Sequence, residues 1–170
     1  MENSTLFRTF GTMLDCSRNA VPNLHTLKKW VDLTASLGYN TLLLYTEDTY
    51  EVPDEPYFGY MRGRYSQAEL RELDAYAKKQ GMTIMPCIQT LAHLYAIKRW
   101  PEYWPHFDTD DILLAGDERV YTLIDHMFRS LAASLSCRTI HLGMDEAEMF
   151  ARGRYYNQHG DCNRSQALLA

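Results

Sequence analysis

The sequence has no hydrophobic run long enough to cross a membrane, because no window approaches the roughly 18 apolar residues that a spanning helix needs. The start of the chain, residues 1–5, also lacks the basic segment and apolar run of a signal peptide. These two absences predict no membrane partner and a cytoplasmic location.

Positive charge is scarce as well. The chain has 17 Lys and Arg residues against 22 Asp and Glu residues, which gives a formal net charge of -5, and the basic residues are scattered. Nucleic-acid-binding proteins usually carry a basic patch that neutralises phosphate groups. The sequence therefore predicts no nucleic-acid partner.

Cysteine is also sparse, and no two cysteines are close in the sequence. This spacing favours free thiols over a disulfide framework or a zinc site. No pair of histidines has the spacing of a metal-binding clamp, so we expect neither a metal nor another cofactor. The four cysteines are Cys16, Cys87, Cys137 and Cys162.

What the chain does contain is an alternation of short apolar runs and helical patterns. Such alternation is typical of a parallel α/β fold. A complete eight-unit barrel usually needs about 250 residues. We therefore expect one domain, residues 1–170, that forms about the first four βα units of a (β/α)8 TIM barrel, or half a barrel. The expected strands are 10–15, 40–45, 82–88 and 138–144, and the expected helices are 24–37, 66–80 and 117–131.

Polar side chains follow each expected strand. Because the carboxyl ends of parallel barrel strands meet at one face, we expect these side chains to converge. Several carboxylates in a partly desolvated cleft should raise the pKa of at least one of them, as a general acid requires. In chain order, the residues are Asp15, Arg18, Glu47, Asp48, His93, Asp145 and Glu146.

The two last acids are sequence neighbours, and neighbours in a regular strand point to opposite faces. Asp145 and Glu146 can therefore serve one site only if the chain turns sharply there. The alternative is that one of them caps a helix over residues 147–152, where an acid is favoured. Two aromatic segments, 57–60 and 100–104, could stack on sugars or could simply pack their loops.

The segment 141–146, His-Leu-Gly-Met-Asp-Glu, resembles the His-x-Gly-x-Asp-Glu signature of the β-N-acetylhexosaminidases of glycoside hydrolase family 20, whose fold is a (β/α)8 barrel. Other strand ends are similar in the same order. Residues 14–18 resemble the first-strand segment with a sugar-binding arginine, and Asp48 falls where the second strand supplies an aspartate. Residues 86–93 resemble the run Pro-Glu-Ile-x-x-x-Gly-His, with Cys87 and Ala92 as departures.

The resemblance implies a retaining hydrolysis of terminal non-reducing β-linked N-acetylglucosamine or N-acetylgalactosamine, in which the substrate's own 2-acetamido oxygen attacks the anomeric carbon. It implies that Glu146 is the general acid and base and that Asp145 orients the acetamido group. Asp48 and His93 would form a relay that tunes Glu146.

The resemblance also implies that Arg18, with Asp15 beside it, binds the sugar. Further groups of the family's site come from later strands, so the 170 residues alone are expected to be inactive. The expected partners are β-linked N-acetylhexosaminide glycans. The alternative is a non-catalytic carbohydrate-binding or assembly half-barrel, and open sheet edges predict self-association.

Overall fold

Three parallel strands form the sheet of this protein. The computed structural model describes residues 7–18 and 20–169, so residues 1–5, on which the expectation of no signal peptide rests, lie outside the described residues. The strands lie in the order β1 (Gly11–Asp15), β2 (Thr41–Tyr45) and β3 (Thr83–Cys87).

The register of the sheet aligns the ends of its strands. Asp15 pairs with Tyr45, and Tyr45 pairs with Cys87, so all three strands end at one level. Whatever follows each strand therefore starts from the same edge of the sheet.

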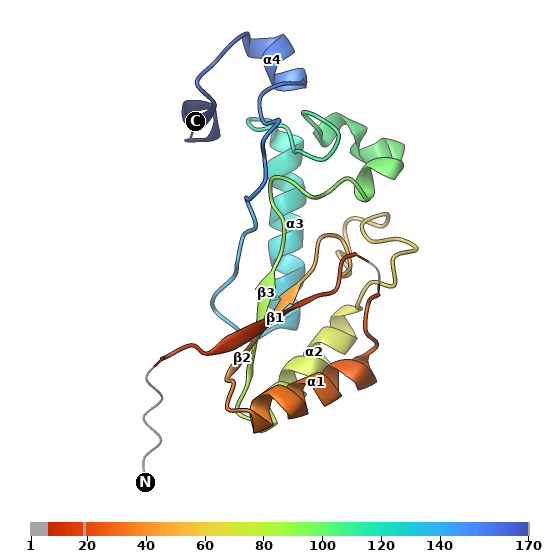
Figure 1. Ribbon diagram of the computed structural model, residues 1–170. Helices are drawn as coiled ribbons and strands as arrows, with labels where there is room; N and C mark the ends of the chain where they lie inside the picture. The colour runs from red at the N-terminus through yellow and green to blue at the C-terminus, as the bar shows by residue number, and fades with distance from the viewer. Residues whose placement is uncertain (1–6, 19, 170) are drawn as a thin grey trace.

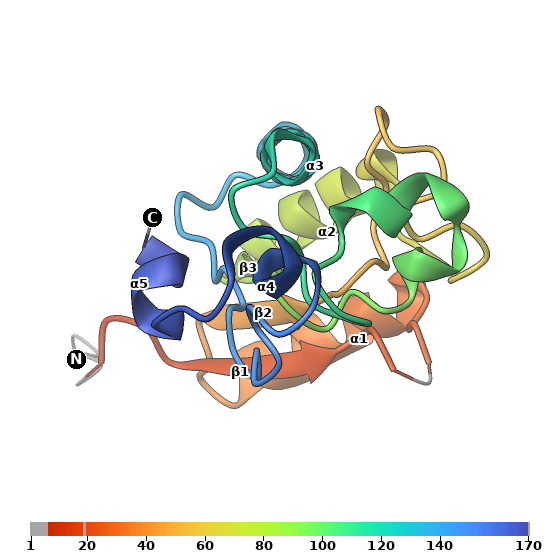
Figure 2. The same ribbon diagram turned by 90° about the horizontal axis from the view of Figure 1, so that it is seen from above.

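Three helices lie side by side on one face of the sheet: α1 (Leu24–Ser36), α2 (Gln67–Lys79) and α3 (Glu118–Ser134). Helix α2 contacts both of the others (Figures 1 and 2). Each helix begins at a side chain that accepts a hydrogen bond from a backbone N–H of the first turn, as Ser66 does from Glu69 in the predicted capping box. The predicted order of strands and helices up to α3 is confirmed.

The core lies between these helices and the sheet. Leu70 and Leu73 of α2 recur at helical spacing and are buried, and Leu42 and Ile84 of the strands are buried with them. Each fully buried aliphatic side chain of this kind contributes about 1.5–3 kcal/mol. The helical face of the sheet is thus well packed.

The opposite face of the sheet is uncovered in the described part of the chain. Met13 of β1 is 50% exposed, and Leu43 and Met85 are only partly buried. This face corresponds to the interior of a barrel, which only a full circle of strands would enclose.

The segment 138–146 runs parallel to β3 but does not form the regular buried strand that we expected. One bridge joins Cys87 to His141, and the His141 N–H donates to the Pro86 carbonyl at 3.0 Å. Leu142 and Met144 are 42% and 46% exposed. A strand in a parallel sheet is buried by neighbours on both sides. Within the described residues, β3 is the only strand beside this segment, so the prediction is wrong.

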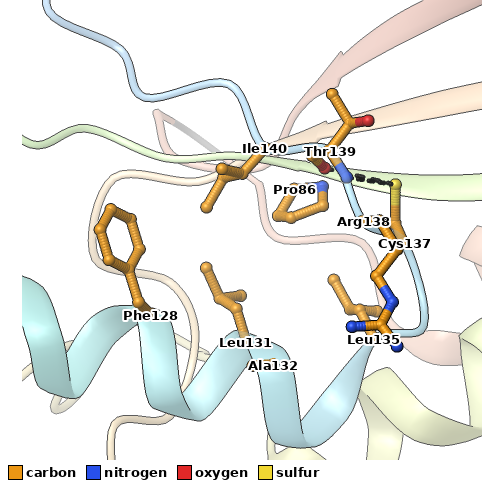
Figure 3. A pocket seen from close by; sticks show the side chains of 9 residues that line it. All are labelled: Pro86, Phe128, Leu131, Ala132, Leu135, Cys137, Arg138, Thr139 and Ile140. Carbon is orange, nitrogen blue, oxygen red and sulfur yellow. Dashed lines mark hydrogen bonds between the residues drawn. The ribbon is translucent and has the colours of Figure 1, made fainter.

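An apolar cavity of about 220 Å³ separates this segment from α3. Figure 3 shows Phe128 and Leu131 of α3 projecting toward Pro86 and Ile140 across this space. The segment is therefore held by backbone hydrogen bonds to β3 and only loosely packed against α3.

The remaining elements are short. The 3₁₀ helices η1 (Ile97–Arg99) and η2 (Pro101–His106) lie between β3 and α3. Helices α4 (Arg154–His159) and α5 (Arg164–Leu169) follow the 138–146 segment (Figures 1 and 2). None of the described helices combines the length and hydropathy that a membrane crossing requires.

Candidate active site

A cleft of about 200 Å³ lies at the carboxyl ends of the strands. Of the predicted site residues, all except Glu47 and Asp48 line it, although they come from three separate segments of the chain. The aligned strand ends bring them together. The lining residues are Met13, Asp15, Arg18, Tyr45, His93, Asp145 and Glu146.

The two adjacent acids face the same cleft because the backbone turns between them. Glu146 has φ of 53°, and His93, which contacts it, has φ of 60°. The His93 Nε2 atom lies 3.3 Å from Glu146 Oε2 and 3.7 Å from Asp145 Oδ2. Non-glycine residues in this left-handed region cost about 1–3 kcal/mol each, and such residues cluster at functional sites. The alternative, a helix over residues 147–152 capped by one of the two acids, is not formed, because residues 148–151 form turns.

Gly143 lets the segment pass close to the end of β3. Its φ is 60°, and a Cβ atom there would lie 2.0 Å from the Ile88 carbonyl oxygen and 2.7 Å from the Gln89 side chain. No other residue type fits this approach without moving backbone. The glycine of the motif therefore brings Asp145 next to Gln89.

Gln89 is a site residue that the sequence analysis missed. Its buried Nε2 atom donates to the Tyr45 hydroxyl oxygen at 2.9 Å and to Asp145 Oδ1 at 3.3 Å. Tyr45 in turn donates to Glu47 Oε1 at 3.3 Å, and that oxygen lies 3.7 Å from Arg18 Nη2. The only sequence signal for Gln89 was its position directly after an apolar strand.

Arg18 is fixed at the rim of the cleft by Asp15. The Asp15 carboxylate accepts hydrogen bonds from Arg18 Nη1 at 2.6 Å and from the Ser17 N–H at 2.8 Å. Burial raises the pKa of Asp15, but hydrogen bonds from Ser17 and Arg18 outweigh it and lower the pKa. The Arg18 guanidinium lies 5.4 Å from the centre of the Tyr45 ring and its side chain is 54% exposed. It is therefore both oriented and accessible.

Asp48 does not line the cleft. It is buried, and its carboxylate accepts a hydrogen bond from Arg62 Nε at 3.1 Å, while Arg62 also donates to the Ser17 carbonyl. The expected contact between Asp48 and His93 is not formed. The reason is that Glu47 takes the position facing Arg18, and Asp48, the next residue, turns toward the loop that carries Arg62.

The carboxyl groups of the site have different proton affinities. Burial raises the pKa of Glu47, partly offset by the charge of Arg18 and the hydrogen bond from Tyr45. Burial also acts to raise the pKa of Asp145, but a backbone hydrogen bond, the Gln89 amide and the charge of His93 outweigh it and lower the pKa. Glu47 is therefore the carboxyl group whose pKa is raised, and the lowered pKa of Asp145 favours its carboxylate form.

Metal-binding groups do not gather in this site. Among the residues that the structure describes, no three His, Cys, Asp or Glu side chains are placed to hold a metal ion. The four cysteines are free thiols.

A parallel sheet whose strand ends gather acids, a histidine and an arginine in one cleft is the arrangement of a TIM-barrel enzyme site. The chain matches the glycosyl hydrolase family 20 catalytic domain over residues 7–169, and it belongs to this family. A β-hexosaminidase from Vibrio furnissii is 27% identical over 86% of this chain and 30% of its own length. One from Akkermansia muciniphila is 28% identical over 81% of this chain and 34% of its own length. The chain thus spans about a third of the length of these curated relatives.

Solved structures of the family have the same fold. The family 20 exo-β-N-acetylglucosaminidase from Vibrio harveyi, in complex with N-acetylglucosamine, superposes with a TM-score of 0.82 at 22% identity, over 95% of this chain and 32% of that chain. A β-N-acetylhexosaminidase from Bacteroides fragilis gives 0.76 at 20% identity, over 94% and 37%. The predicted fold, a TIM-barrel type of which this chain forms about half, is confirmed.

Proposed function

We propose that this chain supplies the acid-bearing part of the active site of a β-N-acetylhexosaminidase. The substrate would be a glycan with a terminal non-reducing β-linked N-acetylglucosamine or N-acetylgalactosamine. Family membership and the two curated β-hexosaminidases support this proposal. The observation that carries it is that Asp145 and Glu146 face one cleft, with His93 Nε2 within 3.7 Å of both.

The proposed reaction divides the work between the two acids. Glu146 donates a proton to the glycosidic oxygen as its bond to the anomeric carbon breaks, and the substrate's acetamido oxygen attacks that carbon. Asp145 accepts the acetamido N–H and offsets the positive charge of the resulting oxazolinium ion. Water then attacks the anomeric carbon and gives a proton back to Glu146, so the product retains the β configuration. The lowered pKa of Asp145 supports its role as a carboxylate.

Three further residues have supporting roles in this proposal. His93 contacts Glu146 and would hold its carboxyl group in place while the proton leaves and returns. Arg18, held by Asp15, would bind hydroxyl groups of the sugar. Asp48 pairs with Arg62 and would act on the site only by holding the loop that carries Arg62.

The cleft of the described chain is too open for efficient catalysis. The side chains of Asp145 and Glu146 are 58% and 72% exposed to solvent. Electrostatic stabilisation of a transition state is strongest where water is excluded. We therefore expect the 170-residue chain to be inactive alone and to require the rest of the barrel.

The second candidate is a carbohydrate-binding or assembly half-barrel that keeps the motif without turnover. It is favoured by the uncovered face of the sheet, where Met13 is half exposed. An exposed apolar surface of this kind favours association with another protein surface.

One assay separates the two candidates. The release of a chromogenic group from an N-acetyl-β-glucosaminide is measured with the 170-residue chain and with a longer form that carries a complete barrel. Activity of the longer form supports the hydrolase. A folded longer form that binds N-acetylglucosamine without turnover supports the second candidate and contradicts the first.

A further inference from the structure

The side-chain nitrogen of Gln89 donates hydrogen bonds to two oxygen acceptors. The side chain is fully buried at the end of β3, below the cleft. Asp145 Oδ1 lies 3.3 Å from its Nε2 atom and the Tyr45 hydroxyl oxygen lies 2.9 Å away. The Tyr45 hydroxyl already donates its proton to Glu47.

These acceptors fix the orientation of the amide. Reversing it would place the amide oxygen against the Tyr45 oxygen and the Asp145 carboxylate, both of which can only accept here. The observed orientation leaves the buried Gln89 Oε1 atom without a hydrogen-bond partner in the described part of the chain. The two hydrogen bonds of the nitrogen therefore determine the orientation of the Gln89 amide.

We propose that Gln89 is a positioning residue for Asp145: its buried NH₂ group holds the Oδ1 atom, so that the other carboxylate oxygen stays on the side of His93 and the cleft. This inference rests on the proposed function, in which that carboxylate receives the acetamido N–H. It requires a hydrogen-bond donor at position 89.

The electrostatics of the site bear on what an acid at position 89 would do to Asp145. Glu47 and Glu146 are already close to the groups that Gln89 and Asp145 contact. A carboxylate at position 89 would add a negative charge next to Asp145 and favour its protonation. A protonated Asp145 could not offset positive charge on the substrate.

Several groups besides Gln89 act on the charge of Asp145. Burial acts to raise its pKa, and a backbone hydrogen bond, the Gln89 amide, His93 and His141 lower it. Burial raises the pKa of the Cys87 thiol, and the charge of Asp145 adds to this shift. Glu146 contacts the same histidine, His93. A test must therefore change residue 89 and leave these groups in place.

The direct test is a pH titration of the Asp145 carboxyl carbon by NMR in the 170-residue chain. Gln89→Met keeps the size of the side chain but removes its donor, and we expect the pKa of Asp145 to rise. Gln80→Met, a change at the exposed end of α2, should leave it unchanged. An unaltered pKa of Asp145 in folded Gln89→Met would overturn the proposal.

A second variant covers the case in which Gln89→Met fails to fold, as judged by circular dichroism. Gln89→Glu keeps both size and polarity and replaces the donor by an acid, so the pKa of Asp145 should again rise. An unchanged value in this variant would equally overturn the proposal.

Kinetics in a longer, active form separate this inference from the proposed function. Gln89→Met should lower kcat on an N-acetyl-β-glucosaminide by about tenfold to a hundredfold with little change in KM, as expected for a misplaced catalytic group. If the longer form is inert but the NMR titration shows the shift, the function fails and the coupling of Gln89 to Asp145 stands. If the longer form is active and Gln89→Met changes neither kcat nor the pKa, the inference alone fails.

Discussion

Adjacent acids can serve a single site only where the backbone between them turns, and the φ of 53° at Glu146 provides that turn. His93 then lies within 3.7 Å of both carboxylates. The surroundings of Asp145 lower its pKa, and Glu146 contacts His93, which supports the division of roles that we propose for an acetamido-assisted hydrolysis.

Replacing Glu146 tests the role of the proton donor. In a longer form that carries a complete barrel, Glu146→Gln should lower kcat by about 10²–10⁴-fold, the usual contribution of a general acid, with KM little affected. Glu148→Gln is the matched control, because Glu148 is exposed and does not line the cleft. A near-normal rate for Glu146→Gln would rule out its role as the acid.

Gly143 offers a test of how the motif approaches β3. Gly143→Ala should reduce the free energy of unfolding by about 1–3 kcal/mol more than Gly116→Ala, measured by urea unfolding. Both residues have positive φ, but a Cβ atom at Gly143 would meet the Ile88 carbonyl at 2.0 Å, and one at Gly116 would meet nothing within 4 Å. Equal losses would show that the close approach does not matter.

The motif residues could be selected from the sequence because the resemblance depends on residue types at fixed spacing. Gln89 could not, because its role depends on a hydrogen bond to Tyr45, which connects the ends of two strands. The family resemblance implied that Asp48 belongs to the relay, and only the side-chain direction shows that it pairs with Arg62.

At the scale of elements, the start of α3 links stability to pH. Asp117 accepts a hydrogen bond from the Arg119 backbone N–H at its N-terminus, and Arg119 Nε donates to the same carboxylate at 2.8 Å. The hydrogen bond from the Arg119 side chain lowers the pKa of Asp117 below its ordinary value of 3.8. The charge of Asp117 therefore contributes stability above that value, and the contribution is lost as the pH falls through the folded-state pKa.

Asp117→Asn separates the charge from the cap, since asparagine also caps helices well. The variant should be less stable than the wild type at about pH 6, and the difference should shrink as the pH falls from about 4 to about 2. Urea unfolding across this range measures it. A difference that is constant with pH would contradict the account.

The elements differ in how much of them the sequence could predict. α1, α2 and α3 have apolar residues at helical spacing and a capping residue, which are both local signals. The segment 138–146 has the composition of a strand, but whether it is buried depends on neighbours that its own sequence does not specify. Leu142 consequently lies exposed, although it falls within the expected strand 138–144.

At the scale of the whole molecule, half a barrel exposes two surfaces that a closed barrel would cover. One is the uncovered face of the sheet with Met13, and the other is the open side of the 138–146 segment with Leu142 and Met144. Exposed apolar surface next to unpaired backbone favours association.

We therefore predict that the 170-residue chain self-associates in a concentration-dependent way, observed as a rising sedimentation coefficient. Leu142→Gln should weaken this association. Leu33→Gln should not, because Leu33 is similarly exposed but lies on α1, away from both surfaces. A monomer at every concentration would contradict the prediction.

We propose that the cleft uses the substrate's own acetamido group, held by Asp145 while Glu146 moves the proton. The most direct measurement compares two chromogenic β-glucosides with the same leaving group, one with a 2-acetamido group and one with a 2-hydroxyl group, in a form that carries a complete barrel. We predict rapid hydrolysis of the first and almost none of the second, because only the acetamido oxygen can attack the anomeric carbon. Equal rates on the two substrates would contradict the account.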